Sequence, residues 1–349
     1  MKAAVLEAFH APLVVRQIAD PELTPEGVIL KVEAVGVCRS DWHAWVGEWG
    51  EKAVPPLPHV LGHEISGTVV ETGSQIRNFK PGDRVIVPFS QGDGSCPYCI
   101  AGHQNVCEHR QMPGFTYKGG FAEYTHIPHA DGNLIHLPDG VEFVEASAMG
   151  CRFMTAFHGV TQRGKVGPGE WVAVYGAGGV GLSAIQIATA MGANVIAVDI
   201  SDDKLDFAKQ VGAVETVNST RHKPSQAIRE LTGGGAHVSI DALGIQETAV
   251  NAVKSLRKQG RHVQIGMTSY ENGGMVELPL NLIVENEIQI AGSFGMPVPE
   301  FPAMLQMVAK RRLEPGKLVT KTISLEELGD AFQDMSNFSG VGVTVVNQF

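Results

Sequence analysis

The sequence predicts an α/β protein in which a mostly-β first part is followed by a doubly wound parallel sheet. The chain has 349 residues, more than one hydrophobic core usually organises, so two domains are expected. The first 150 residues contain short strand patterns between turn signals, whereas strand and helix patterns alternate from Trp171 onward. Such alternation is typical of parallel sheets whose strands are connected by helices.

The expected strands of the first part are rich in β-branched residues or alternate apolar with polar residues, and glycine or proline lies near each. They cover residues 28–37, 65–73, 83–89 and 119–128.

In the second part, glycines after the helical patterns and Ser201 before one of them mark expected helix ends. Strands are expected at 171–176, 194–200, 214–218, 236–243, 261–267 and 288–295, with helices at 180–192, 201–212, 223–232 and 246–258. The tail from Pro297 contains a helix, a short helix near 324–336 and a final strand at 342–349, and it could return to the first domain.

The charge pattern excludes several partners. The formal net charge is −10, from 27 Lys+Arg and 37 Asp+Glu, and no basic cluster stands out, so neither nucleic acid nor an anionic membrane is an expected partner. The N-terminus lacks the apolar run of a secretory signal, which favours the cytoplasm. Residues 171–198 carry no charge, but glycines and amides divide the stretch into strand, turn and helix rather than a membrane span.

A glycine-rich turn lies between the expected strand at 171–176 and the helix after it. The turn consists of Gly176, Ala177, Gly178, Gly179, Val180 and Gly181. With a strand before, a helix after and Asp199 closing the next strand, it fits a dinucleotide-binding turn that places a pyrophosphate at a helix N-terminus. Asp199 would accept hydrogen bonds from ribose hydroxyls and repel a 2′-phosphate, which favours NAD over NADP; alternatively it caps the next helix. Lys204 could reach the same ribose or be solvated.

Five cysteines in a chain assigned to the cytoplasm favour metal ligation or simple burial over disulfides. Cys38, His63 and Cys151 are isolated in the sequence, and each alone fits a structural role. Together with a dinucleotide domain they form a set of two thiolates and one imidazole, which suits a catalytic zinc with an open fourth position.

These residues resemble those of the zinc-dependent medium-chain alcohol dehydrogenase family. Residues 62–76, GHEISGTVVETGSQI, fit that family's zinc signature without a mismatch. The resemblance implies a GroES-like catalytic domain at 1–152, a Rossmann NAD-binding domain at 153–295 and a segment at 296–349 that returns to the catalytic domain.

The resemblance also implies roles for single residues. Cys38, His63 and Cys151 would bind the catalytic zinc, and Glu64 would support it or act as a transient ligand, unless it is a surface carboxylate. In the stretch CRSDWH, Arg39 would pair with the pyrophosphate, Ser40 would bind the substrate oxygen and His43 would pass the proton to solvent. Asp41 would orient the metal site. Further residues fall near the nicotinamide or the substrate pocket, or crowd the same loop: Thr155, Phe89, Phe153, Trp42, Trp45 and Trp49.

A second metal site is implied at residues 91–107. The family's structural zinc lobe has the spacing C-x2-C-x2-C-x7-C, and the last three cysteines fit while an aspartate takes the first position. The expected ligands are Asp93, Cys96, Cys99 and Cys107. The alternative is a lobe without metal that is held by reduced thiols.

The expected function is therefore reversible oxidation of a primary or secondary alcohol to an aldehyde or ketone with transfer of hydride to NAD. Alternatives are a zinc polyol or formaldehyde dehydrogenase, a zinc-free quinone or enoyl reductase relative that uses NADPH, and a non-catalytic protein on the same fold. The resemblance implies a homotetramer, with a homodimer as the alternative. The ordinary histidines are expected to include His59 and His109.

Overall fold

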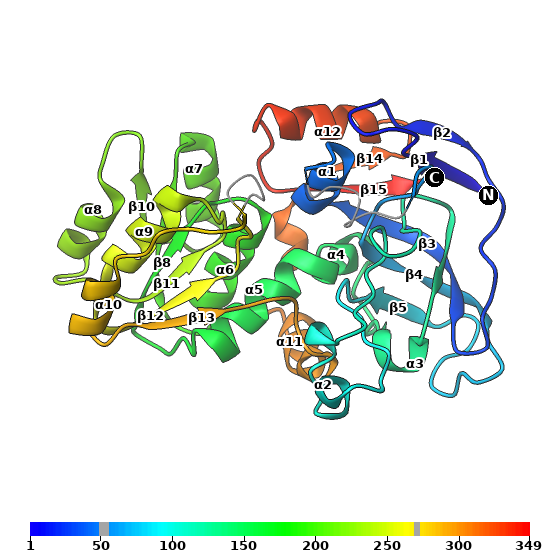
Figure 1. Cartoon of the computed structure of the whole chain (residues 1–349), viewed down its shortest axis with the longest axis horizontal. Coiled ribbons are helices and arrows are strands. Elements are labelled where there is room, and N and C mark those ends of the chain that lie inside the picture. Colours follow the sequence, from blue (N-terminus) through cyan, green and yellow to red (C-terminus); the bar gives the residue numbers. More distant parts are fainter. Residues whose placement is uncertain (49–55, 269–272) are drawn as a thin grey trace. The chain divides into compact units, whose positions relative to one another are not determined.

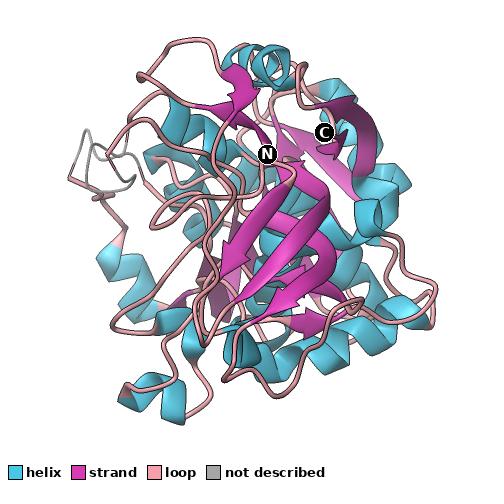
Figure 2. Cartoon of the chain, turned by 90° about the vertical axis from the view of Figure 1, so that its right-hand side faces the viewer, coloured by secondary structure: helices cyan, strands magenta, loops and turns pink. Residues whose placement is uncertain are grey.

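The computed structural model describes residues 1–48, 56–268 and 273–349, which form two compact units. One unit comprises Met1–Met154 and Gly295–Phe349, and the other comprises Thr155–Phe294. Their limits lie within two residues of the predicted domain limits at 153 and 296. Both chain termini belong to the first unit (Figures 1 and 2).

The first unit contains a seven-stranded sheet in the order β14-β15-β3-β4-β5-β7, with β6 paired to β3. All its pairs are antiparallel except β14 with β15; its strands are magenta in Figure 2. The strands are β3 (Val28–Val37), β4 (Glu64–Thr72), β5 (Arg84–Val87), β6 (Tyr124–Ile127), β7 (Ile135–His136), β14 (Val319–Ser324) and β15 (Val343–Gln348), and a separate pair is formed by β1 (Lys2–Val5) and β2 (Val14–Gln17).

Short helices connect these strands. They are α1 (Arg39–Trp45), α2 (Pro97–Ile100), η1 (Gln104–Val106), α3 (Ala130–Asn133), α4 (Phe143–Ser147), the π-helical turn η2 (Met149–Phe153), η5 (Val298–Glu300), α11 (Phe301–Ala309), η6 (Pro315–Leu318) and α12 (Leu328–Ser336). The tail of the chain completes the sheet, since Thr344 of β15 pairs with Val37 of β3.

The second unit is a six-stranded, wholly parallel sheet in the order β10-β9-β8-β11-β12-β13. Its strands are β8 (Trp171–Tyr175), β9 (Asn194–Asp199), β10 (Glu215–Asn218), β11 (Ala236–Asp241), β12 (Leu256–Gln264) and β13 (Gln289–Gly292). Its helices are α5 (Met154–His158), η3 (Gly159–Arg163), α6 (Gly179–Ala190), α7 (Asp202–Gln210), α8 (Pro224–Leu231), α9 (Gln246–Lys254) and α10 (Leu280–Glu285).

The strand order reverses at β8, from which the chain moves first toward β10 and then toward β13. Because such crossovers are right-handed, helices of the two halves cover opposite faces of the sheet (Figure 1). The carboxyl ends of β8 and β11 meet at the reversal point, where doubly wound sheets bind their ligands.

One predicted boundary in this unit is wrong. The helix expected at 246–258 ends at Lys254, and β12 begins at Leu256 instead of Arg261. Leu256 continues the helical spacing of Ala249, Ala252 and Val253, but it packs beside Ile288 as part of β12. The carbonyl of Ser255 accepts a hydrogen bond from the backbone N–H of Ala236 (2.9 Å), which ties the chain to β11 at this point.

None of the helices in the described ranges is both long and apolar enough to cross a bilayer. The uncharged stretch at 171–198 instead forms β8, α6 and β9.

Candidate functional site

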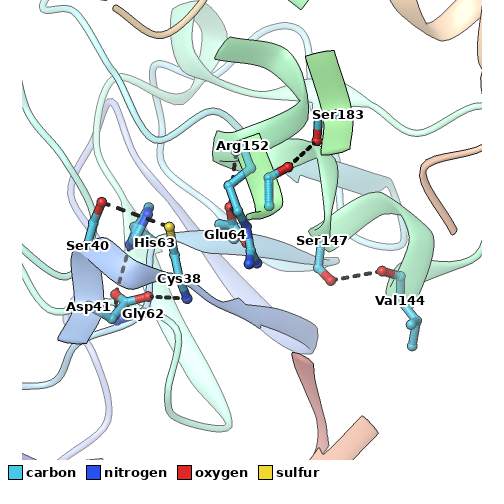
Figure 3. Close-up of polar contacts among 11 residues, drawn as sticks. Cys38, Ser40, Asp41, Gly62, His63, Glu64, Val144, Ser147, Arg152 and Ser183 are labelled. Atoms are coloured by element: carbon cyan, nitrogen blue, oxygen red, sulfur yellow. Dashed lines mark hydrogen bonds and ion pairs between the residues drawn. The ribbon is translucent and has the colours of Figure 1, made fainter. Parts of the chain in front are cut away.

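The buried site in the first unit begins at Cys38, where β3 ends and α1 begins. Cys38 precedes the first residue of α1, and its backbone N–H donates to Asp41 Oδ2 (3.1 Å). Its Sγ lies 3.9 Å from Ser40 Oγ, and the residue is 4% exposed. The turn therefore places a thiol and a hydroxyl together, with the carboxylate of Asp41 below them (Figure 3).

His63 reaches the same place from the start of β4. Its Nδ1 is 2.8 Å from Asp41 Oδ1, which also accepts from the backbone N–H of Gly62 (3.1 Å). Gly62 has φ +100°, and a Cβ there would lie 2.8 Å from Phe121 N, so only glycine fits this turn. With the Asp41 carboxylate accepting the Nδ1 proton, Nε2 is left as the ligating nitrogen.

His63 Nε2 is buried and has no hydrogen-bond partner among the described residues. A buried polar atom without a partner needs an explanation. One ligand atom from each of Cys38, His63, Glu64 and Cys151 lies within 4.8 Å of the others. This set therefore fits a zinc ion.

Cys151 enters the site from the π-helical turn η2. Local π-helical turns are frequent at functional sites. Gly150 allows the turn to approach β4, because a Cβ there would already lie 3.1 Å from Glu64 Cα and 3.2 Å from Val87 O. The fold thus brings together Cys38 and Cys151, which lie more than a hundred residues apart in the sequence.

The protons of this site are shared between its ligand residues. A hydrogen bond from Cys151 holds the pKa of Cys38 well below its usual value, and the same bond raises the pKa of Cys151. Burial lowers the pKa of His63, but the Asp41 carboxylate and Cys38 together outweigh burial and raise it. Metal ions must displace such protons, so zinc affinity at this site should fall as the pH falls.

Glu64 is fully buried and paired with Arg152. Its Oε1 accepts from the backbone N–H (3.1 Å) and Nε (2.8 Å) of Arg152, and its Oε2 pairs with Arg152 Nη2. Burial raises the pKa of Glu64 to about 7, whereas Arg152 lowers it. The reading of Glu64 as a surface carboxylate is therefore wrong, and Arg152 is a site residue that sequence reasoning missed.

The remaining predicted residues of α1 have contacts within the first unit. The guanidinium of Arg39 stacks on Trp42 (3.6 Å) and Phe338 (4.6 Å), and its Nη1 donates to Met335 O (2.5 Å). His43 Nδ1 is hydrogen-bonded to Glu48 Oε2. Contact of Arg39 with a pyrophosphate stays a prediction.

The aromatic residues near the site divide into two groups. Trp45 is 5% exposed, and its Nε1 donates to Ala11 O (2.7 Å). Trp45 therefore packs in the core of the first unit. Phe153 is fully buried, whereas the ring of Phe89 lies 6.0 Å from that of His63. Phe115, which sequence reasoning missed, lies closer to His63 at 5.2 Å. Of the predicted residues, Trp49 lies outside the described residues.

The glycine-rich turn of the second unit has the geometry of a dinucleotide-binding turn. Gly176 has φ +92°, and a Cβ at Gly181 would lie 1.7 Å from Gly176 O, so close packing excludes any other residue there. Gly178 precedes α6, and a Cβ there would meet nothing within 4 Å. Gly179, Val180 and Gly181 form the first turn of α6, whose backbone N–H groups favour an anion.

Asp199 closes β9 beside this turn. Its Oδ2 accepts from the backbone N–H of Ala177 (2.7 Å), and its Oδ1 accepts from those of Ile200 (2.8 Å) and Ser201 (3.0 Å). The residue that caps α7 is Ser201, which accepts from the backbone N–H of Lys204 (3.5 Å). Asp199 thus carries a carboxylate to the glycine-rich turn instead of capping the helix. Thr155 is buried in α5.

The second cysteine cluster has the dimensions of a tetrahedral zinc site. Cys96 Sγ and Cys107 Sγ are 3.8 Å apart, and Asp93 Oδ1 lies 3.4 Å from Cys107 Sγ and 3.7 Å from Cys99 Sγ. Tetrahedral zinc with ordinary bond lengths requires about 3.8 Å between two sulfurs and about 3.5 Å between sulfur and oxygen. The four predicted residues therefore fit a zinc ion.

Backbone and side-chain donors support the ligand set. Backbone N–H groups of Cys99 and His109 point at the sulfurs of Cys96 (3.4 Å) and Cys107 (3.3 Å). A hydrogen bond from the backbone of Glu108 lowers the pKa of Cys96 to about 7, and burial raises that of Cys99 to about 12. His109 Nδ1 lies 2.8 Å from Asp93 Oδ2. His109, expected to be an ordinary histidine, thus orients the carboxylate.

Known proteins share both the sequence and the fold. The alcohol dehydrogenase GroES-like domain matches residues 24–139, and the zinc-binding dehydrogenase family matches residues 179–310. An alcohol dehydrogenase of Geobacillus stearothermophilus is 36% identical over 336 residues, 96% of both chains. An NAD-dependent alcohol dehydrogenase of Sulfurisphaera tokodaii is 33% identical over 354 residues, 99% of both chains.

A solved structure extends this likeness to the whole fold. The alcohol dehydrogenase TADH from Thermus sp. ATN1 matches with a TM-score of 0.92 at 30% identity, and the match covers 100% of both chains. The chain therefore belongs to the zinc-dependent alcohol dehydrogenase family and is an oxidoreductase of that type. The predicted family and the predicted combination of a GroES-like domain with a Rossmann-type sheet are confirmed.

Proposed function

We propose that this chain is an NAD-dependent alcohol dehydrogenase that oxidises a primary or secondary alcohol to an aldehyde or ketone. The observation that carries the proposal is the partnerless Nε2 of His63, which lies with two thiols and a carboxylate in one buried cluster. Zinc held by Cys38, His63 and Cys151 would supply a Lewis acid that makes an alcohol easier to deprotonate. NAD supplies the hydride acceptor.

The chain's own residues position the reactants and carry the proton. Asp41 orients the imidazole of His63, and Arg152 holds Glu64. Ser40, 3.9 Å from the Cys38 sulfur, would bind the substrate hydroxyl, and His43 would pass its proton to solvent. Asp199 at the glycine-rich turn supports NAD over NADP, because its carboxylate would repel a 2′-phosphate.

The activity is tested with a panel of primary, secondary, benzylic and polyhydroxy alcohols and formaldehyde, each with NAD and with NADP. Formation of NADH at 340 nm from at least one simple alcohol is expected, with NAD preferred. His63→Ala should abolish it, whereas Cys99→Ser, in the other cluster, should leave the zinc-replete enzyme active. Turnover of polyols alone would favour a polyol dehydrogenase, and a protein without NAD-linked turnover of any substrate would refute the proposal.

We also propose that Asp93, Cys96, Cys99 and Cys107 bind a structural zinc, and that the enzyme is a cytoplasmic homotetramer. Cysteines used as metal ligands suit a reducing compartment. Light scattering of the purified protein should give about four times the chain mass of 37.3 kDa; twice that mass would indicate the homodimer.

A further inference from the structure

We propose that Glu48 is a positioning residue for His43, one that fixes its imidazole for proton release. The inference rests on the proposed function, in which His43 passes the proton of the alcohol to solvent. Its observation is the hydrogen bond between Glu48 Oε2 and His43 Nδ1.

The end of α1 places Glu48 beside His43. The backbone N–H of Gly47 donates to Ala44 O (3.1 Å), and that of Glu48 donates to His43 O (3.1 Å). Val46 is the C-cap of α1, so these two bonds define a Schellman motif. The motif folds the residue after the glycine back over the residue five positions earlier.

Gly47 is essential to this turn. It has φ +72°, and a Cβ there would lie 2.9 Å from Phe9 Cγ, so both backbone conformation and packing favour glycine. In Schellman motifs the residues brought together frequently make a hydrophobic contact. Here they are a carboxylate and an imidazole, so the sequence H-A-W-V-G-E encodes the pairing.

The Glu48–His43 pair is partly shielded from solvent. Both side chains are 26% exposed, and the ring of Trp42 lies 5.2 Å from that of His43 in an edge-on arrangement. Arg39, one helical turn before His43, is also near: burial lowers the pKa of its guanidinium, while the charge of Glu48 raises it. Glu48 thus lies near two residues of α1, of which Arg39 is predicted to bind the pyrophosphate and His43 is predicted to pass the proton to solvent.

A carboxylate at Nδ1 has a defined chemical effect. It accepts the Nδ1 proton, which keeps the lone pair of the neutral imidazole on Nε2. A proton that arrives at Nε2 forms an imidazolium, which the carboxylate stabilises until Nε2 releases the proton to solvent. One proton enters and one leaves, and Glu48 itself stays ionised.

The test compares Glu48→Ala in the wild-type and His43→Gln backgrounds, using single-turnover rates of NADH formation by zinc-loaded enzyme. Loss of the group that orients an acid–base residue should lower the reaction rate roughly tenfold. In the wild-type background the rate should fall by about this factor with little change in the KM for alcohol. In the His43→Gln background it should change less than about twofold, and Glu48→Asp should recover part of the loss.

A spectroscopic readout is independent of turnover. In protein with 15N-labelled histidine, the resonances missing from His43→Gln identify His43, which should carry its neutral-state proton on Nδ1. Glu48→Ala should lose this preference. Equal rate losses in both backgrounds, or an unchanged tautomer, would overturn the role of Glu48, whereas a wild-type enzyme that oxidises no alcohol would overturn the proposed function instead.

Discussion

Replacement of Arg152 by methionine should destabilise the first unit strongly, because it leaves the Glu64 carboxylate buried without its partner. Glu64 is 0% exposed, and the substitution removes the bonds from Nε (2.8 Å) and Nη2, leaving only the backbone N–H. Two charge-assisted hydrogen bonds are worth about 1.5–3 kcal/mol each. Loss of one partner of a buried ion pair typically costs about 3–5 kcal/mol, so a decrease in this range is expected.

The assay is equilibrium urea unfolding followed by tryptophan fluorescence, with zinc content matched between variants. Three of the chain's four tryptophans precede residue 50, so the signal reports mainly on the first unit. A matched control in the same unit is Arg16→Met, which breaks the exposed pair with Glu7 (41% and 49% exposed) and should cost less than about 1 kcal/mol.

The double variant Glu64→Gln/Arg152→Met separates burial of a charge from loss of packing. It removes the carboxylate charge, so it should be more stable than Arg152→Met alone. If Arg152→Met is no more destabilising than Arg16→Met, the buried pair of Glu64 and Arg152 does not stabilise the first unit.

Three further results are expected. Asp199→Asn should lower the ratio of kcat/KM for NAD over NADP about tenfold, because the repelling charge is gone; an unchanged ratio would argue against Asp199 as the selector. Asp93→Ala should reduce zinc from about two ions per chain to about one, measured by plasma mass spectrometry, and two remaining ions would count against that ligand. Burial lowers the pKa of His59 to about 4, so the unfolded state binds this proton first and stability falls as the pH drops from about 6.5 toward 4. In urea unfolding, His59→Leu should lose up to about 3 kcal/mol less stability than the wild type over this pH range. An equal loss of stability in both proteins would contradict this expectation.

Features that depend on local spacing were predictable from the sequence. The strand at 28–37 coincides with β3, since most of its residues are apolar and buried and it lies inside the sheet. The glycine-rich turn was predictable because the backbone of one strand–turn–helix unit has no room for a side chain at Gly176 and Gly181. The edge strand β14 was not foreseen, because half of its residues are exposed and its stability comes from pairing with β15.

Features that depend on side chains brought together by the fold were harder to foresee. Arg152 and Glu64 are 88 residues apart, and no local pattern connects them. His109 could have been found, since it follows the last lobe cysteine by two residues. Glu48 also had a signal, the glycine that ends α1 directly before it, but the pairing with His43 depends on the Schellman geometry.

The most direct measurement follows a deuterium atom from the carbinol carbon of a labelled alcohol to the cofactor. Mass spectrometry of the product should show NADH one mass unit heavier with the zinc-loaded wild-type enzyme, and no labelled NADH with His63→Ala. Reduced cofactor without deuterium, or equal labelling by the His63→Ala variant, would contradict hydride transfer at the site formed by Cys38, His63 and Cys151.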